Sequence, residues 1–196
     1  MFAKHGVDVL ATDLEIEAAT EQGWAKTHQH MSSRDILNKR GIASPADFAQ
    51  RVRIMNVDMN HIPAEVKDFD FAWSTCALGH IGGLEQGLAF IENSLAVIKP
   101  GGLLVHTTEL NLSSDTHTFE SDGTVVYRKR DIQALVARLT AQGHEVKVNF
   151  NIGDKELDRH IDDPPYSNDK HLRLRLGSYA VTSLGLIVRK NPNATP

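Results

Sequence analysis

Cysteine and long apolar runs are nearly absent from this sequence. Cys76 is the only cysteine among the 196 residues, so the chain can form no internal disulfide, and such sparse use of cysteine is typical of the reducing cytoplasm. No apolar run approaches the roughly 20 residues that a membrane-spanning helix needs. Asp8 and Asp13 interrupt the apolar start of the chain, which argues against a secretory signal peptide. We therefore expect a soluble, cytoplasmic protein with no membrane partner.

An excess of either charge is also missing. The formal net charge is −4, whereas binding to nucleic acid normally needs a basic surface. Hydrophobic residues make up 41% and charged residues 23% of the chain, as in ordinary globular proteins. The length suits one α/β domain with a sizeable core and is too short for two. We expect a single domain over residues 1–196 that does not bind nucleic acid.

Short apolar runs alternate with helical patterns along most of the chain. Strands are predicted at residues 7–12, 51–57, 69–75, 103–108, 145–150 and 178–188. Apolar residues recur at three- and four-residue steps over 84–98 and 130–141, which predicts two amphipathic helices, and 15–40 is a helix-prone stretch. The pattern indicates an α/β fold with a Rossmann-like, mostly parallel, doubly wound sheet. No clear helix separates the last two strands, so the terminal strand is expected to run antiparallel.

Two acids follow two of the predicted parallel strands. Asp13 comes directly after 7–12 and Asp58 directly after 51–57. Ligands of open α/β sheets bind outside the carboxyl ends of the strands, so both side chains are candidates for ligand binding. The alternative is that each acid caps the helix that follows it.

Five features in order carry a resemblance to a known family. They are Asp13, the segment 56–59 (NVDM), the strand 69–74 (FDFAWS), the loop 77–81 (ALGHI) and the turn 99–102 (KPGG). In this order and spacing the chain resembles class I S-adenosylmethionine-dependent methyltransferases from their second strand onward. The resemblance implies S-adenosylmethionine as the cofactor. It places Asp13 on the ribose, Asp58 and Met59 at the adenine, and Ser74 among the cofactor-binding residues.

Two departures from the family pattern stand out. Gly79 occupies a loop position where members commonly carry Glu, and the glycine-rich GxGxG loop after the first strand is absent. The resemblance therefore implies a domain that is incomplete at its N-terminus and lacks its first strand. We expect such a chain to bind S-adenosylmethionine poorly, and its exposed strand edges would favour a homo-oligomer.

The resemblance also implies which residues face the methyl acceptor. His80, just beyond the fourth strand of the family, and His106 and Glu109, near the end of the fifth, are the catalytic candidates. A histidine can accept a proton near neutral pH. Residues of the same strand end and of the polar excursion 151–176 are expected to bind substrate: Thr108, Asn111, Asp158, His160 and Tyr166. The alternatives are a surface or capping role for His80 and an ordered, solvated loop for the excursion.

Other groupings are weaker. Imidazole and carboxylate groups suit a divalent ion, but the candidates show no compact ligand spacing, and we expect no metal: His106, Glu109, Asp158, His160 and Asp162. His28 and His30 would point apart on a helix. Tyr166 and Lys170 match the Tyr-x-x-x-Lys pair of short-chain dehydrogenases, but they follow two prolines in turn-forming sequence, and we interpret the match as chance.

Three functions compete at this point. The leading one is methyl transfer to a small-molecule acceptor, as an O- or N-methyltransferase, with an association to saccharide genes in similar proteins. The second is a catalytically inactive, methyltransferase-like binding or oligomerisation module, which the missing glycine loop favours. A nicotinamide-dependent Rossmann enzyme is third, because the KPGG turn and the antiparallel last strand fit the methyltransferase pattern better.

Overall fold

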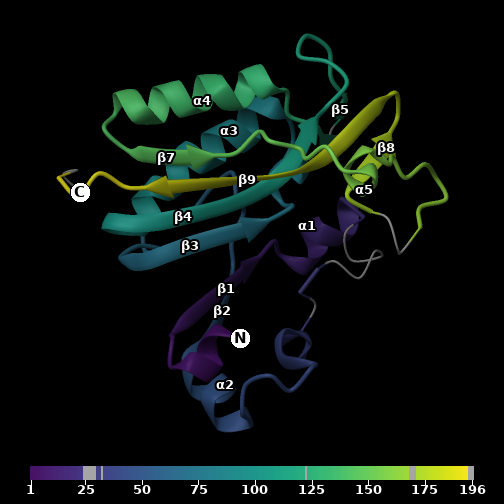
Figure 1. Ribbon diagram of the computed structural model, residues 1–196. Coiled ribbons are helices and arrows are strands. Elements are labelled where there is room, and N and C mark those ends of the chain that lie inside the picture. Colours follow the sequence, from purple (N-terminus) through teal and green to yellow (C-terminus); the bar gives the residue numbers. More distant parts are fainter. Residues whose placement is uncertain (24–29, 32, 122, 168–170, 194–196) are drawn as a thin grey trace. The chain divides into compact units, whose positions relative to one another are not determined.

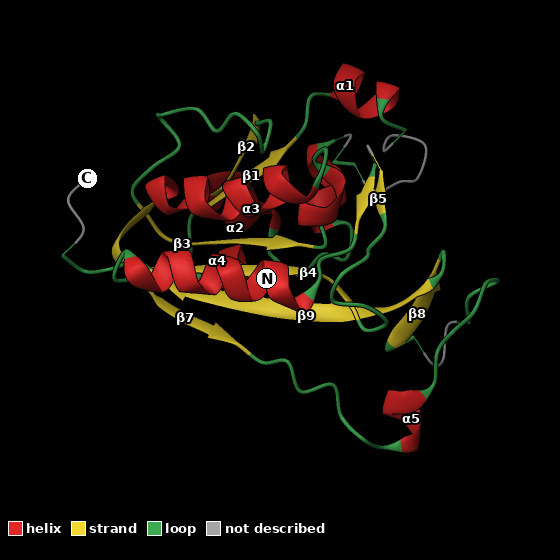
Figure 2. Ribbon diagram, turned by 90° about the horizontal axis from the view of Figure 1, so that it is seen from above, coloured by secondary structure: helices red, strands yellow, loops and turns green. Residues whose placement is uncertain are grey.

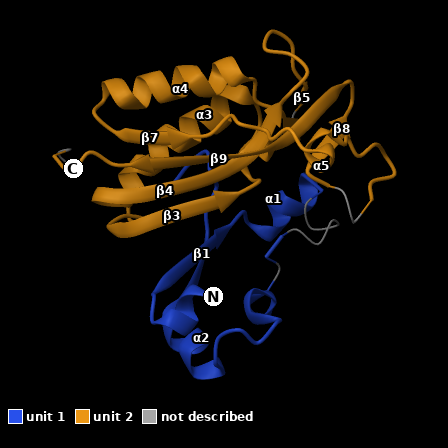
Figure 3. Ribbon diagram, viewed as in Figure 1, with its two compact units in different colours: residues 1–63 blue, residues 64–196 orange. Residues whose placement is uncertain are grey.

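The computed structural model describes residues 1–193 apart from 24–29, 32, 122 and 168–170 (Figure 1). The chain forms two compact units, Met1–Pro63 and Ala64–Pro196 (Figure 3), and each is described by itself. The expectation of a single domain over 1–196 stays a prediction. In the described residues, no helix has both the length and the apolar character needed to cross a membrane.

Unit 1 is built on two parallel strands. Its elements are the 3-10 helix η1 (Phe2–His5), β1 (Val9–Asp13), α1 (Ile16–Glu21), the 3-10 helix η3 (Arg34–Asn38), α2 (Pro45–Arg51) and β2 (Val52–Asn56). The β1–β2 register runs from Val9 opposite Val52 to Asp13 opposite Asn56. Both predicted strands are therefore confirmed, and their carboxyl ends lie side by side.

Local sequence explains the start of α2 and the small core of unit 1. The Ser44 hydroxyl accepts a hydrogen bond from the Asp47 amide at 3.1 Å, and Pro45 occupies the first helical turn, a position where a missing N–H costs nothing. The buried core consists of Ala3, Ala43 and Val52, packed by Val9 and Phe48. This apolar cluster holds η1 and α2 against the base of the two strands.

The helix expected over 15–40 is wrong in extent. α1 ends at Glu21, followed by Gly23 at a positive φ of 88°, and Ser33 is extended at φ −155° and ψ 155°. Between them, the Met31 amide donates to the Asp13 carboxylate and not to a helical carbonyl. A side-chain acceptor distant in sequence therefore replaces the helical hydrogen bond at this point, which local helix propensity does not anticipate.

Unit 2 contains the larger sheet. Its elements are β3 (Phe69–Thr75), the 3-10 helix η4 (Leu78–His80), α3 (Leu84–Asn93), the 3-10 helix η5 (Ser94–Val97), β4 (Ile98–Asn111), β5 (Glu120–Ser121), β6 (Thr124–Val125), α4 (Lys129–Ala141), β7 (Glu145–Val148), α5 (Glu156–Arg159), β8 (Arg173–Leu176) and β9 (Tyr179–Arg189). The strand order is β3-β4-β9-β7, with β8 also paired to β9. β3 and β4 are parallel, and β9 runs antiparallel to each of its three partners. The α/β class and the antiparallel last strand are confirmed.

Alternation along β4 defines the covered face of this sheet. Side chains at even positions from Leu104 to Leu110 are buried, whereas those at odd positions are half-buried. Figure 2 shows α3 and α4 on one face of the sheet, and Phe90 of α3 contacts His106 of β4. The even positions therefore face the helices, as the period of two along a strand requires.

Two boundaries in unit 2 differ from expectation. The helix predicted to reach residue 98 ends at Asn93, and β4 begins at Ile98, before Leu103. The register shifts between Phe69 opposite Ile98 and Phe71 opposite Leu103. Gly101 adopts a φ of 78° in this irregular stretch and donates its amide to Lys190. Pairing of Ile98 with Phe69 of β3, together with the hydrogen bond from the Gly101 amide to the Lys190 carbonyl, thus begins the strand in a sequence that resembles a turn.

The excursion 151–176 has more structure than a loop. It contains α5 and the strand β8, which forms a tight hairpin with β9 through Gly177, at a φ of 56°. Glycine adopts such a conformation without steric cost. The hairpin places the end of the excursion beside the first residues of β9, which pair with the last residues of β4.

We predict that Gly87→Ala destabilises the protein by about 2 kcal/mol, within the range for overpacking a core. A Cβ at Gly87 would overlap the hydroxyl of the buried Tyr127, and it would lie 2.8 Å from the carbonyl oxygen of Leu78. Gly185→Ala is the matched control, because a Cβ there meets nothing within 4 Å. Denaturant unfolding of both variants measures the difference, and equal stabilities would contradict the packing of α3 described above.

Candidate functional site

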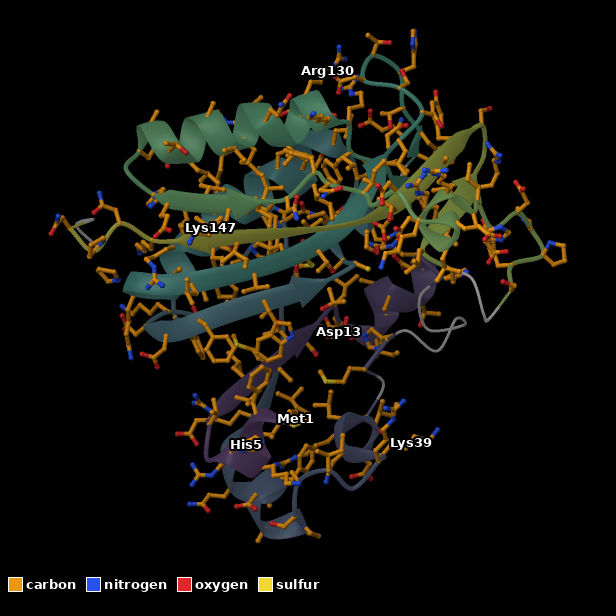
Figure 4. All side chains as sticks on the ribbon, viewed as in Figure 1. Met1, His5, Asp13, Lys39, Arg130 and Lys147 are labelled. Carbon is orange, nitrogen blue, oxygen red and sulfur yellow. The ribbon has the colours of Figure 1, made fainter. Side chains whose placement is uncertain are left out.

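Asp13 ends β1 and stands at its junction with α1, as labelled in Figure 4. Its Oδ1 accepts a hydrogen bond from the Leu14 amide at 2.8 Å, and its Oδ2 accepts one from the Met31 amide at 2.7 Å. The side chain is 30% exposed. Each carboxylate oxygen has two acceptor sites, so the amides fix the carboxylate while leaving it able to accept further hydrogen bonds.

His30 and Met31 were missed by sequence reasoning as partners of Asp13. The His30 side chain is 5% exposed, and its Nε2 lies 2.7 Å from the Leu14 carbonyl oxygen and 3.8 Å from Asp13 Oδ1. No local signal identifies these contacts, because they join residues on either side of α1. His28, which was considered together with His30, lies outside the described residues.

Asp58 follows β2 in a tight turn. Its Oδ1 accepts the Asn60 amide at 2.8 Å, and its Oδ2 lies 2.7 Å from Nδ1 of the exposed His61. Partial burial opposes ionisation, but the hydrogen bonds from His61 and from the Asn60 amide outweigh it, so the pKa of Asp58 is lowered. The half-buried Met59 follows directly. Asp58 is therefore an ionised, partly exposed carboxylate at neutral pH.

Ser74 and His106 form a buried polar pair between β3 and β4. Ser74 Oγ lies 2.8 Å from His106 Nδ1, and Ser94 Oγ lies 3.5 Å from His106 Nε2. His106 is 1% exposed, and burial lowers its pKa to about 4. The ring is therefore neutral at neutral pH. The structure brings a predicted cofactor residue and a predicted catalytic residue together, but inside the sheet layer.

The loop after β3 turns sharply at Cys76. This residue adopts a φ of 50°, which is uncommon for a residue other than glycine. Its amide lies 3.1 Å from both the carbonyl and the hydroxyl oxygen of Thr107. The chain then forms η4, and Nδ1 of the half-buried His80 lies 2.8 Å from the Gly123 carbonyl oxygen. β4 and the β5–β6 segment thus hold this loop from two sides.

Glu109 brings a half-buried carboxylate to the same loop. Its Oε2 lies 3.3 Å from the position that a Cβ on Gly79 would take. Burial raises the pKa of the Cys76 thiol, and Glu109 raises it further, against a hydrogen bond from Thr107 that lowers it. Burial also raises the pKa of Tyr127, and three carboxylates add to it: Glu109, Asp131 and Glu120. The Glu109 charge therefore acts on both the Cys76 thiol and the Tyr127 hydroxyl.

Thr108 and Asn111, the other predicted substrate residues of β4, are buried. Thr108 is 4% exposed and lies on the helix-covered face. Asn111 is 5% exposed. Its side-chain amide hydrogen-bonds the backbone of the loop that follows: Nδ2 donates to the His117 carbonyl, and Oδ1 accepts hydrogen bonds from the Ser113 and Ser114 amides. Asn111 thus shapes the loop that follows the strand end.

The predicted substrate residues of the excursion make local contacts. Asp158 accepts the Lys155 amide at 3.1 Å at the start of α5, His160 is exposed at its end, and the Tyr166 hydroxyl donates to the Arg175 carbonyl at 2.7 Å. These contacts order the excursion. Whether the three residues bind substrate stays a prediction, and Lys170, once matched with Tyr166, lies outside the described residues.

Asp162 is the centre of the excursion, a role that sequence reasoning missed. Its carboxylate accepts the Ser167 amide and lies 2.8 Å from His171 Nδ1. The His171 hydrogen bond is the main cause of the lowered pKa of Asp162. Within the described parts of the chain, no group of three or more His, Cys, Asp or Glu side chains could hold a metal ion.

No protein-family model matches this sequence, and no curated protein matches it. Solved structures do. DhpI in complex with SAH is 16% identical with a TM-score of 0.50 over 95% of this chain and 67% of its own. The [4+2]-cyclase SpnF is 17% identical with a TM-score of 0.51, and the match covers 94% of this chain and 66% of SpnF. An O-methyltransferase family protein from Burkholderia thailandensis is 12% identical with a TM-score of 0.50, and the match covers 99% of this chain and 54% of that protein.

This chain has the class I methyltransferase fold. It spans about two thirds of the length of DhpI and SpnF. The methyltransferase fold confirms the fold implied by the sequence resemblance. It does not by itself fix the reaction, since SpnF is described as a cyclase and one fold supports many activities.

We predict that His106 makes stability depend on pH between 6.5 and 4. Its folded pKa of about 4 lies below the ordinary 6.5, so in this window the unfolded chain binds the proton and the folded chain does not. Stability is therefore lost as pH falls, by about 3 kcal/mol. His106→Gln should remove this loss in urea unfolding at several pH values. His117→Gln, which removes an exposed histidine, should follow the wild-type curve; a His106→Gln curve that did so too would contradict the assignment.

Proposed function

We propose that this protein transfers a methyl group from S-adenosylmethionine to a hydroxyl or amine of a small molecule. The observation that carries the proposal is the occurrence, in a methyltransferase fold, of fixed and partly exposed carboxylates at the ends of β1 and β2. Ligands of such sheets bind outside these ends. We also propose a cytoplasmic location, because the chain contains one cysteine.

The described residues fit the nucleoside end of the cofactor. Asp13 keeps acceptor sites beyond those used by the Leu14 and Met31 amides, and two ribose hydroxyls need such acceptors. Asp58, with its lowered pKa, suits the adenine amino group, and Met59 offers apolar contact to the ring. DhpI and PigF, which share the fold, are described as structures with SAH.

We propose roles toward the methyl acceptor for residues of β4 and of the loop that follows β3. When bound, S-adenosylmethionine supplies the methyl group and keeps the electron pair of the broken carbon–sulfur bond. Glu109 accepts the proton that the acceptor oxygen or nitrogen loses as it forms its bond to carbon. His80 hydrogen-bonds the acceptor from the neighbouring loop. His106, being buried and neutral, supports the strand ends through Ser74.

Substrate recognition is proposed for the polar residues that frame the end of β4. Thr108 and Asn111 shape this end from within, and the excursion supplies Asp158, His160 and Tyr166. The β8–β9 hairpin carries the excursion to the same end of the sheet, since Arg173 pairs with Thr182 and Thr182 with Leu110. Strands lie about 4.8 Å apart, so Arg173 and Leu110 are separated by roughly 10 Å of sheet.

We predict that Asp13→Asn weakens binding of S-adenosylmethionine by about 1–3 kcal/mol, the range for hydrogen bonds to a charged group. Equilibrium dialysis with labelled cofactor measures the change. Asp8→Asn is the control, because Asp8 is an exposed carboxylate of the same unit that pairs with Arg51. Equal binding by the two variants would remove Asp13 from the site, and no binding by wild type at any concentration would favour the inactive-module alternative.

A further inference from the structure

Gly79 and Glu109 are packed against each other at the end of β4. A Cβ on the buried Gly79 would lie 3.3 Å from Glu109 Oε2 and 2.8 Å from the Val125 carbonyl oxygen. The second separation is shorter than real Cβ contacts, so any side chain at residue 79 would displace a neighbour. The Val125 carbonyl is the nearer obstacle, and the Glu109 carboxylate, at the end of a flexible side chain, would also have to move away from such a Cβ.

The backbone conformation at residue 79 does not require glycine. Gly79 is not among the glycines with positive φ, whereas Gly82 in the same loop has a φ of 122°. Other residues could adopt the backbone of η4 at Gly79. The requirement for glycine is therefore one of space, and the atoms that use the space are the Glu109 carboxylate and the Val125 carbonyl.

The Cys76 thiol also lies close to the Glu109 carboxylate, which is a second observation on its position. The turn at Cys76 brings its thiol beside Thr107, with Sγ 3.7 Å from Oγ1, and beside Glu109. Burial is the main cause of the raised pKa of the thiol, Glu109 adds to it, and the Thr107 hydroxyl opposes it. As the only cysteine of the chain, Cys76 is a built-in reporter of where the Glu109 charge lies.

We infer that Gly79 is a positioning residue for Glu109: its missing side chain leaves the space from which the Glu109 carboxylate faces the methyl acceptor. The inference rests on the proposed function, in which Glu109 receives the acceptor proton. An acceptor that loses a proton, a hydroxyl or an amine, is the class that such a carboxylate serves.

The alkylation rate of Cys76 by iodoacetamide, measured against pH on the full chain without cofactor, tests the inference. The thiolate is the reacting form, so a lower thiol pKa means faster alkylation below that pKa. Glu109→Gln should raise the rate at pH 8 several-fold. Gly79→Ala should do the same because the added methyl group displaces the carboxylate. In the Gly79→Ala background, Glu109→Asp, shorter by one methylene, should restore the slow rate.

Two results would overturn the inference. One is a folded Gly79→Ala variant that alkylates at the wild-type rate, as the control Gly185→Ala should. The other is a rate increase from Gly79→Ala that persists undiminished when Glu109→Gln is already present, because the increase would then not arise from the carboxylate. If Gly79→Ala does not fold, a pH titration of the Gly79 Hα resonances by NMR takes its place. In the wild type these resonances should shift as Glu109 ionises, and in Glu109→Gln they should not. Wild-type Gly79 resonances that do not shift would overturn the inference.

These readouts separate the inference from the proposed function. A chain that binds no S-adenosylmethionine in dialysis overturns methyl transfer, whereas the Cys76 rates still report whether Gly79 places the Glu109 carboxylate. Where methyl transfer to an acceptor such as catechol is measurable, Gly79→Ala and Glu109→Gln should lower kcat by the same factor. A Gly79→Ala variant with wild-type kcat would overturn the positioning role alone.

Discussion

The fourteen-residue strand β4 is the element on which unit 2 depends. It pairs with β3 on one side and β9 on the other, and its alternating side chains serve two purposes. Even positions enter the layer under α3 and α4, where His106 is held neutral by burial. Odd positions emerge on the other face, where Thr107 fixes Cys76 and Glu109 lies against Gly79. A register slip of one residue would exchange these faces, and both the packing under the helices and the contacts of Thr107 and Glu109 would be lost.

The main strands of this fold could be predicted from the sequence because each is a short run rich in apolar residues. Helix extents were harder. At Met31 a helical hydrogen bond is replaced by one from its amide to Asp13. β4 begins early because Ile98 pairs with Phe69 of β3. β8 was missed because its alternation of Arg and Leu covers only four residues within a polar excursion, and pairing with β9 completes the strand. In each case a long-range contact overrides local propensity.

For the candidate site, the sequence predicted the positions of the acids but not their hydrogen-bond partners. Acids at strand ends are visible in sequence, and Asp13 and Asp58 stand where such acids were expected. Their partners, Met31 and His61, depend on how the following loops fold. The contact of Gly79 with Glu109 joins η4 to the end of β4, and no spacing rule reveals it. His106 shows what the sequence does not reveal about the site. Its residue type suggests a general base, but burial lowers its pKa to about 4 and makes it a weak one.

The account ties nucleoside binding to the ends of β1 and β2, and amide resonances test this most directly. Titration of the ¹⁵N-labelled chain with S-adenosylhomocysteine should shift the amides of Leu14 and Met31, which hold Asp13, and that of Asn60, which holds Asp58. The amide of Asp8, at the opposite end of β1, should stay in place. Saturating ligand that leaves the first three amides unmoved, or that moves only residues elsewhere, would contradict the proposed cofactor site.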